Sequence, residues 1–217
     1  MNIRYMYGKK KFLKPVIRGE KGIRLSDLSH YSRMENEEMR DNEMEKKFTL
    51  DRYLYPIHIN DTQINPDNMT SDPYFTLFPR HCYCVCFTRR GNDHELYNKF
   101  QADICIAFDV EKLQERLALL SERFPGIYFQ GKDIIYYHPG TPPGTFLPDE
   151  LVFVKPHCFI HEAEYRIALF YPLNKRGFAT KEGRDIPFRI DGESMHMEVG
   201  HIEPSFIRDC VIDVFYP

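Results

Sequence analysis

The chain has 217 residues, of which 42% are hydrophobic and 28% are charged, and its formal net charge is −3. These values are ordinary for a globular protein, and the weak acidity gives no general case for nucleic-acid binding through bulk charge. No apolar run is long enough to span a bilayer, so we expect a cytoplasmic protein with no membrane partner.

The N-terminal third, residues 1–73, has a polar and irregular pattern. Residues 22–31 favour a strand that leads into a turn, and the charged residues 35–47 favour a solvated helix or a loop. Asn, Asp, Thr, Ser and Pro collect in residues 60–73, which is typical of a loop. We therefore expect this part to wrap over a compact sheet core formed by residues 74–217.

The second part of the chain is predicted to hold most of the strands. Apolar, β-branched and aromatic runs predict strands at residues 81–88, 103–108, 165–171, 186–190, 195–199 and 210–216. Residues 127–129 and 134–137 flank a turn-like stretch and predict a hairpin. Helices are predicted at 94–100 and 110–124, the latter capped by Asp109. The pattern indicates an α+β single domain with a mixed, mainly antiparallel sheet and a few helices.

Six cysteines raise the question of a metal site. Cys82, Cys84 and Cys86 alternate within a predicted strand and so point to one face. None of them belongs to a C-x-x-C pair of the kind that builds a zinc site. We expect reduced thiols in the core and no metal, with a site built from His81 and the alternating cysteines as the minor alternative.

An acidic pair at the start of the strand at 165–171 is the densest candidate site. Glu162, Glu164 and Arg166 share one face if the strand extends back to them, because side chains repeat every second residue. Two acids and a guanidinium are costly to bury unless they pair or take part in chemistry. The alternatives are a salt bridge at a strand end and a polar site in which the carboxylates act on a ligand.

Two further places are weaker candidates. In the polar turn after the strand at 81–88, Thr88 could donate a hydrogen bond and Arg89 could help to clamp phosphate. Tyr97 in the short helix could stack on a ring, but a solvated loop explains these residues individually. Arg4, flanked by aromatics in a predicted strand at 3–7, could bind a nucleotide phosphate or pair with an acid on an edge strand.

Several segments, taken in order, resemble a bacterial domain-of-unknown-function family, some of whose relatives are associated with abortive phage infection. The resemblance covers nearly the whole chain, through residues 25–31, 35–43, 86–97, 104–108, 159–166 and 207–212. Its most specific element is an E-x-E-Y-R run, matched by Glu162, Glu164, Tyr165 and Arg166. In the short helix, where the family usually has Trp followed by Tyr, this chain has Tyr97 and Phe100.

More distantly, the order of Arg4, Thr88 and the E-x-E pair is similar to that of ADP-ribosyltransferases. The likeness implies NAD as the substrate, with Arg4 holding its phosphate or ribose and Thr88 supporting the nicotinamide pocket. Glu164 would engage the nicotinamide ribose and stabilise an oxocarbenium-like transition state, and Glu162 would activate the acceptor. Arg89, Tyr97 and Arg166 complete the expected binding residues.

Two functions follow from these resemblances. One is an NAD-dependent ADP-ribosyltransferase-like toxin or phage-defence effector that acts on an unknown protein or nucleic-acid target. The alternative is a non-enzymatic binding or sensing protein of a phage-defence system, in which the acidic pair is tied to Arg166 and opens onto no cavity. A nuclease is a weaker third hypothesis, because the sequence lacks a spaced acid cluster and a basic surface.

Overall fold

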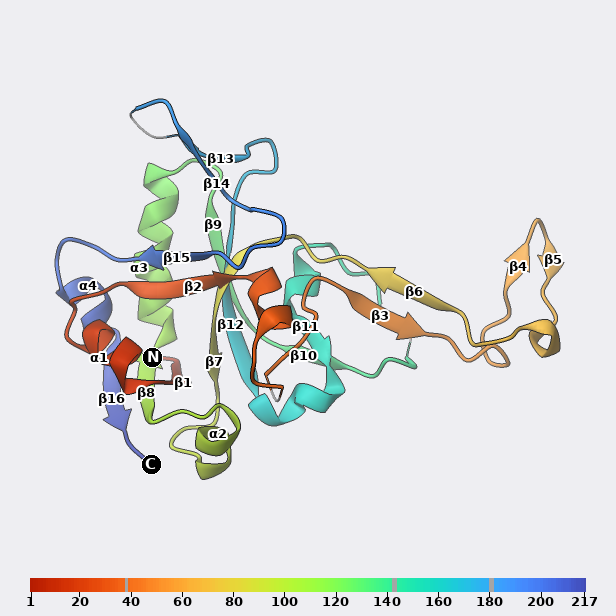
Figure 1. The fold of residues 1–217 in the computed structure, drawn as a ribbon, viewed down its shortest axis with the longest axis horizontal. Helices are drawn as coiled ribbons and strands as arrows, with labels where there is room; N and C mark the ends of the chain where they lie inside the picture. Colours follow the sequence, from red (N-terminus) through yellow and green to blue (C-terminus); the bar gives the residue numbers. More distant parts are fainter. Residues whose placement is uncertain (38, 142–143, 180–181) are drawn as a thin grey trace.

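The structure, a computed structural model, describes residues 1–37, 39–141, 144–179 and 182–217. At its centre is an eight-stranded sheet (Figure 1), in which every strand pair of the described residues is antiparallel. Its spatial order is β15 (His196–Val199), β2 (Ile23–Asp27), β7 (Tyr83–Thr88), β1 (Ile3–Gly8), β8 (Ile104–Asp109) and β16 (Val211–Phe215), with β12 (Glu164–Phe170) beside β7 and β9 (Tyr128–Asp133) beside β12. The α+β prediction is confirmed.

Strand β7 is the hub of this sheet. It pairs with β12 along its whole length, including Glu164 opposite Thr88. Its other edge is shared by two strands, since Cys84 pairs with Ser26 of β2 and Thr88 pairs with Tyr5 of β1. The buried, aromatic and thiol-rich sequence of β7 suits a strand with neighbours on both edges. As a result, β1 and β2 diverge from each other along one edge of β7.

Smaller elements surround the sheet. Two-stranded antiparallel sheets are formed by β3 (Lys46–Thr49) with β6 (Tyr74–Leu77), β4 (His58–Ile59) with β5 (Thr62–Gln63), and β13 (Gly177–Ala179) with β14 (Asp185–Pro187). In the described residues, the one parallel pair is β10 (Ile135–Tyr137) with β11 (Val154–Pro156). The helices are α1 (Lys10–Ile17), α2 (His94–Lys99), α3 (Val110–Arg123) and α4 (Ser205–Arg208), with 3-10 turns η1 (Leu28–Arg33), η2 (Pro66–Asn68), η3 (Glu150–Phe153) and η4 (His157–Glu162). Figure 1 shows the β3–β6 and β4–β5 ribbons projecting from the body as an arm.

The two faces of the β7–β12 pair pack against separate apolar cores. Helix α3, which Asp109 caps by accepting from the Lys112 amide, packs Leu113 and Leu117 on the face that carries Ile167. The opposite face carries Cys82, Cys84, Ala168 and Phe170, which pack against Leu28, Val152 and Phe153. This alternation is the one predicted for residues 165–171. The even-numbered positions of β7 and β12 therefore share one face of the sheet, and Glu164 and Arg166 lie on that face.

The predicted hairpin at 127–137 is wrong. Residues 128–133 form one strand, β9, which pairs with β12, whereas β10 pairs with β11. The glycine in this stretch marks a close approach rather than a turn, because a Cβ at Gly131 would overlap the side chains of Gln114 and Tyr165. The predicted strand at 186–190 is also shorter and earlier, Asp185–Pro187, and lies at the surface.

The N-terminal third is more deeply involved than its polar composition predicts. Strands β1 and β2 lie within the main sheet, so the sheet is not confined to residues 74–217. The segment 35–47, expected to be solvated, contributes Glu43 and Lys46, whose side chains are fully buried. None of the helices in the described part of the chain has the length and apolar character required to cross a bilayer.

Candidate functional site

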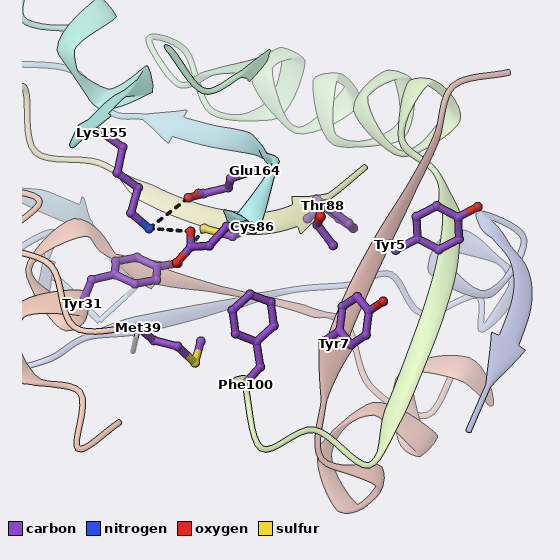
Figure 2. Close-up of a pocket in the computed structure, with 11 residues that line it drawn as sticks. Tyr5, Tyr7, Tyr31, Met39, Cys86, Thr88, Phe100, Lys155 and Glu164 are labelled. Atoms are coloured by element: carbon purple, nitrogen blue, oxygen red, sulfur yellow. Dashed lines mark hydrogen bonds and ion pairs between the residues drawn. The ribbon is translucent and has the colours of Figure 1, made fainter. Parts of the chain in front are cut away.

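The candidate site is a cavity of about 90 Å³ against β7. Its lining consists of Tyr5, Tyr7, Tyr31, Met39, Cys86, Phe87, Thr88, Phe100, Lys155, Glu162 and Glu164. Figure 2 shows an aromatic end, with Tyr5, Tyr7 and Phe100, and a polar end, with Lys155 and Glu164. The cavity therefore combines ring-stacking surfaces with titratable groups, which is the usual composition of a small-molecule site.

The sheet register brings the polar side chains of this cavity together. Glu164 opens β12 directly opposite Thr88 of β7, and Cys86 lies two residues before Thr88 on the same face. Tyr5 and Tyr7 alternate in the same way along β1, with Tyr5 opposite Thr88. Residues from three strands, distant in sequence, are thus held on one wall by backbone pairing.

Glu162 also lines the cavity, but it belongs to a different element from the one that the sequence predicts. It ends the 3-10 turn η4 and is not part of the strand, which begins at Glu164. Between them Ala163 adopts a left-handed conformation with φ of 43°. Both carboxylates nevertheless accept from Lys155 Nζ, at 2.6 Å for Glu162 Oε2 and 3.2 Å for Glu164 Oε2. The two carboxylates thus share a lysine partner, although Glu162 lies outside the strand that was predicted to carry it.

Arg166 lies behind the cavity in a buried network of charges. Its Nε donates to Glu164 Oε1 at 2.8 Å, and its two terminal nitrogens donate to the carboxylate of Glu43 at 2.7 and 3.1 Å. It also donates to the carbonyl of Val152 at 2.7 Å. Lys46 Nζ donates to Glu43 at 2.7 Å. Positive and negative groups alternate along this network, which is how a protein can tolerate charges without water.

Burial and the neighbouring charges shift the pKa values of Glu162 and Glu164 in opposite directions. Burial raises the pKa of Glu162 to about 8, because the ion pair with Lys155 does not offset burial and the nearby anion of Glu164. Burial also opposes ionisation of Glu164, but the charges of Arg166 and Lys155 outweigh it and hold the pKa of Glu164 well below its usual range. The two carboxyls thus differ in how readily they ionise, a division typical of acid–base chemistry.

The expected phosphate-binding arginines do not line the cavity. Since Tyr5 and Tyr7 face the cavity, Arg4 between them points to the other side of the sheet. There Arg4 packs over the ring of Tyr165 at 5.0 Å and lies 3.4 Å from Asp133. Arg89 is exposed and lies 4.0 Å from the same carboxylate of Asp133. Both arginines thus have a charge partner outside the site.

Tyr97 also lies outside the lining and supports it indirectly. Its buried ring meets Tyr7 edge-on with centroids 5.0 Å apart, and its hydroxyl donates to Asn92 at 3.2 Å. Phe100, one turn later, is the residue that reaches the cavity. Thr88 does line the cavity, and its hydroxyl oxygen accepts from the Arg90 amide at 3.0 Å.

Metal ligation finds no support in the arrangement of the described residues. In these residues no group of three or more His, Cys, Asp or Glu is placed to hold a metal ion. The cysteines are free thiols, and Cys86 Sγ lies 3.0 Å from the Tyr31 hydroxyl. Cys158 is exposed, which corrects the expectation that it lies in the core.

The network residues Glu43, Lys46 and Lys155 have no counterpart in the sequence prediction. Lys155 gave a usable signal, since a lysine directly after the apolar residues 152–154 is unlike a solvent-facing position. No such signal marks Glu43, which meets Arg166 across 123 residues of sequence.

A scan against protein-family models found no match, and searches of curated proteins and of solved structures also gave none.

Proposed function

We propose that the protein is an NAD-dependent ADP-ribosyltransferase-like enzyme that acts as a toxin or phage-defence effector. The observation that carries the proposal is the shared cavity of Thr88, Glu162 and Glu164, three residues that the ADP-ribosyltransferase likeness singles out. At about 90 Å³ the cavity is smaller than the usual small-molecule site, so on this proposal it takes at most the nicotinamide ring and the rest of NAD lies outside it. The rings of Tyr5 and Tyr7 offer faces for the positively charged nicotinamide ring.

The two carboxyls suit the two halves of the transfer. When the bond between ribose C1′ and the nicotinamide nitrogen breaks, its electron pair leaves with nicotinamide and positive charge develops on the ribose. The ionised Glu164 is a fixed anion that stabilises this charge, and its remaining lone pairs can accept from a ribose hydroxyl. The acceptor then forms its bond to C1′ and gives its proton to Glu162. Arg4 has no part in this scheme, because it faces away from the cavity.

The raised pKa of Glu162 sets the pH dependence of the transfer. Glu162 can accept a proton only after it has lost its own, which at a pKa of about 8 leaves a minor fraction active at neutral pH. The rate should therefore rise with pH and level off above about pH 8. A rate that is independent of pH between about 6 and 9 would remove Glu162 from the role of base.

The first test is binding and turnover of NAD by the whole chain. Millimolar NAD should raise the melting temperature, and incubation should release nicotinamide. Glu162→Gln should remain folded, with a melting temperature near neutral pH at least as high as that of the wild type, and lose roughly 100-fold or more in release, since the removed group is a general base. Glu122→Gln, an exposed position on α3, is the matched control and should behave like the wild type. The absence of a melting shift with millimolar NAD would contradict the proposal.

A second candidate, a non-enzymatic binding or sensing protein of a phage-defence system, is favoured by the network itself. Both oxygens of Glu164 are already engaged, one by Arg166 and one by Lys155. The expectation that the acidic pair opens onto no cavity is wrong, because both carboxylates line one. On this hypothesis a ring-bearing ligand raises the melting temperature without being consumed. Growth of cells that express the wild type or Glu162→Gln separates the two candidates further, because relief of growth arrest by this substitution requires catalysis.

A further inference from the structure

The net charge of −3 conceals a strongly basic segment at the surface. Residues 9–21 contain one carboxylate, Glu20, and the basic residues Lys9, Lys10, Lys11, Lys14, Arg18 and Lys21. All of them except Lys10 are exposed. We call the exposed side chains of this segment the α1 surface. It corrects the expectation, drawn from the sequence, that the chain has no basic surface.

Helix packing explains why the basic residues face outward together. Val16 of α1 is buried in the core, and Leu13 and Ile17 pack against the same core. Residues three and four apart share a helix face, so Lys11 and Lys14 lie together on the other side. The apolar side of the helix is therefore already covered by protein, and the basic side is left to solvent.

The charges of this surface are mostly uncompensated. Arg18 pairs with Glu20, with its Nε 2.7 Å from a carboxylate oxygen. In the part of the chain that the structure describes, Lys9, Lys11 and Lys14 form no ion pair with a carboxylate. Clustered charges of one sign create a positive electrostatic potential at the surface, and this potential attracts a polyanion.

Exposed aromatic rings lie among these lysines. Phe12 is 62% exposed, and Lys11 Nζ lies 4.8 Å from its ring centroid. Tyr216 is 51% exposed, with Lys10 Nζ 4.9 Å from its centroid. Cations beside solvent-facing rings are the combination that holds a phosphate backbone and stacks its bases.

We propose that the α1 surface binds single-stranded nucleic acid. An acidic membrane is the competing polyanion, but a membrane-surface helix inserts a broad apolar face. Here that face is packed inside the protein, and Phe12 is the one exposed large hydrophobic residue of α1. The proposal is independent of NAD turnover, because it uses none of the residues that line the cavity.

Fluorescence anisotropy with labelled oligo(U) and oligo(dT) of about 20 nucleotides tests the proposal on the full chain. If four basic side chains of the α1 surface contact phosphates, raising the salt concentration from about 50 mM to about 200 mM should weaken binding roughly 50-fold. Lys11→Gln with Lys14→Gln should weaken it roughly tenfold at low salt and flatten the salt dependence. Phe12→Ala should cost about fivefold or more through lost stacking. The matched control neutralises Lys175 and Arg176, exposed basic neighbours elsewhere on the surface, and should change affinity by less than about twofold.

Three results would overturn the proposal. One is the absence of binding to both oligonucleotides at about 50 mM salt. Another is an equal loss in the α1 variant and in the control variant, which would indicate bulk charge alone. The last is binding to phosphatidylserine–phosphatidylcholine vesicles, lost in Phe12→Ala, without oligonucleotide binding. Circular dichroism of each variant establishes that it is folded before affinities are compared.

Discussion

Replacing Glu162 by Gln should change how stability depends on pH. In the folded state the pKa of Glu162 is raised to about 8, above its ordinary value of 4.5. Between these two values the folded protein binds more protons at this residue than the unfolded chain does. The free energy of unfolding of the wild type should consequently fall as pH rises through this window. Gln cannot titrate, so the variant lacks this contribution.

The size of the effect follows from the shift. One titrating group changes the free energy of unfolding by at most about 1.4 kcal/mol per pH unit. From about pH 5.5 to about pH 7.5, the stability of Glu162→Gln relative to the wild type should therefore increase by roughly 2 kcal/mol. Burial also raises the pKa of Asp41 to about 6 and lowers that of His81 to about 4. Both groups are present in wild type and variant, so the difference between the two isolates Glu162.

Urea unfolding followed by circular dichroism, at several pH values, measures this difference. The chain has no Trp, which makes the far-ultraviolet signal the more direct probe. Glu122→Gln serves as the control, and its difference from the wild type should not vary with pH. If the difference for Glu162→Gln were also constant, Glu162 would be ionised in the folded protein. The ion pair with Lys155 would then dominate over burial, and the division into an acid and a base would fail.

Two further substitutions test the packing around the cavity. Glu43→Gln should lower the free energy of unfolding by about 3 kcal/mol, since it removes one partner from a fully buried set of ion pairs. The exposed Glu45→Gln should change it little, and equal effects in urea unfolding would refute the role of the network. Gly91→Ala should cost about 1–3 kcal/mol and reshape the cavity, because a Cβ there would overlap the ring of Tyr5. Gly140→Ala, where a Cβ would lie within 4 Å of no atom of the described residues, is the control for thermal unfolding.

Local sequence pattern predicted most of the buried strands and the long helix. The strand at 165–171 and the Asp109 cap were recognisable because each depends on neighbours in sequence. The strand at 128–133 was not, because its glycine is explained by Tyr165 and Gln114 of other elements. Composition alone predicted a turn at this glycine, whereas contacts with residues distant in sequence hold the segment as a strand.

The candidate site was predictable only in part for a similar reason. The acidic pair could be found from its two-residue alternation, and Thr88 from its place at the end of a buried strand and from the ADP-ribosyltransferase likeness; all three line the cavity. Alternation also implied that Arg4 and Tyr5 face opposite sides of the sheet, but not which side carries the cavity. The partners of Arg166 that complete the network come from residues far away in the chain, where no periodicity links them.

The strand order has a consequence for how the chain is made. The outer strands β15 and β16, which cover β2 and β8, come from residues 196–215. A growing chain that has not yet reached these residues presents two bare strand borders, one near its start and one near its middle. Such borders invite pairing with other chains, and distant pairings are slow to form. A chain stalled before residue 196 should therefore self-associate through β2 and β8, whereas a chain that includes residues 196–215 pairs these two strands with β15 and β16.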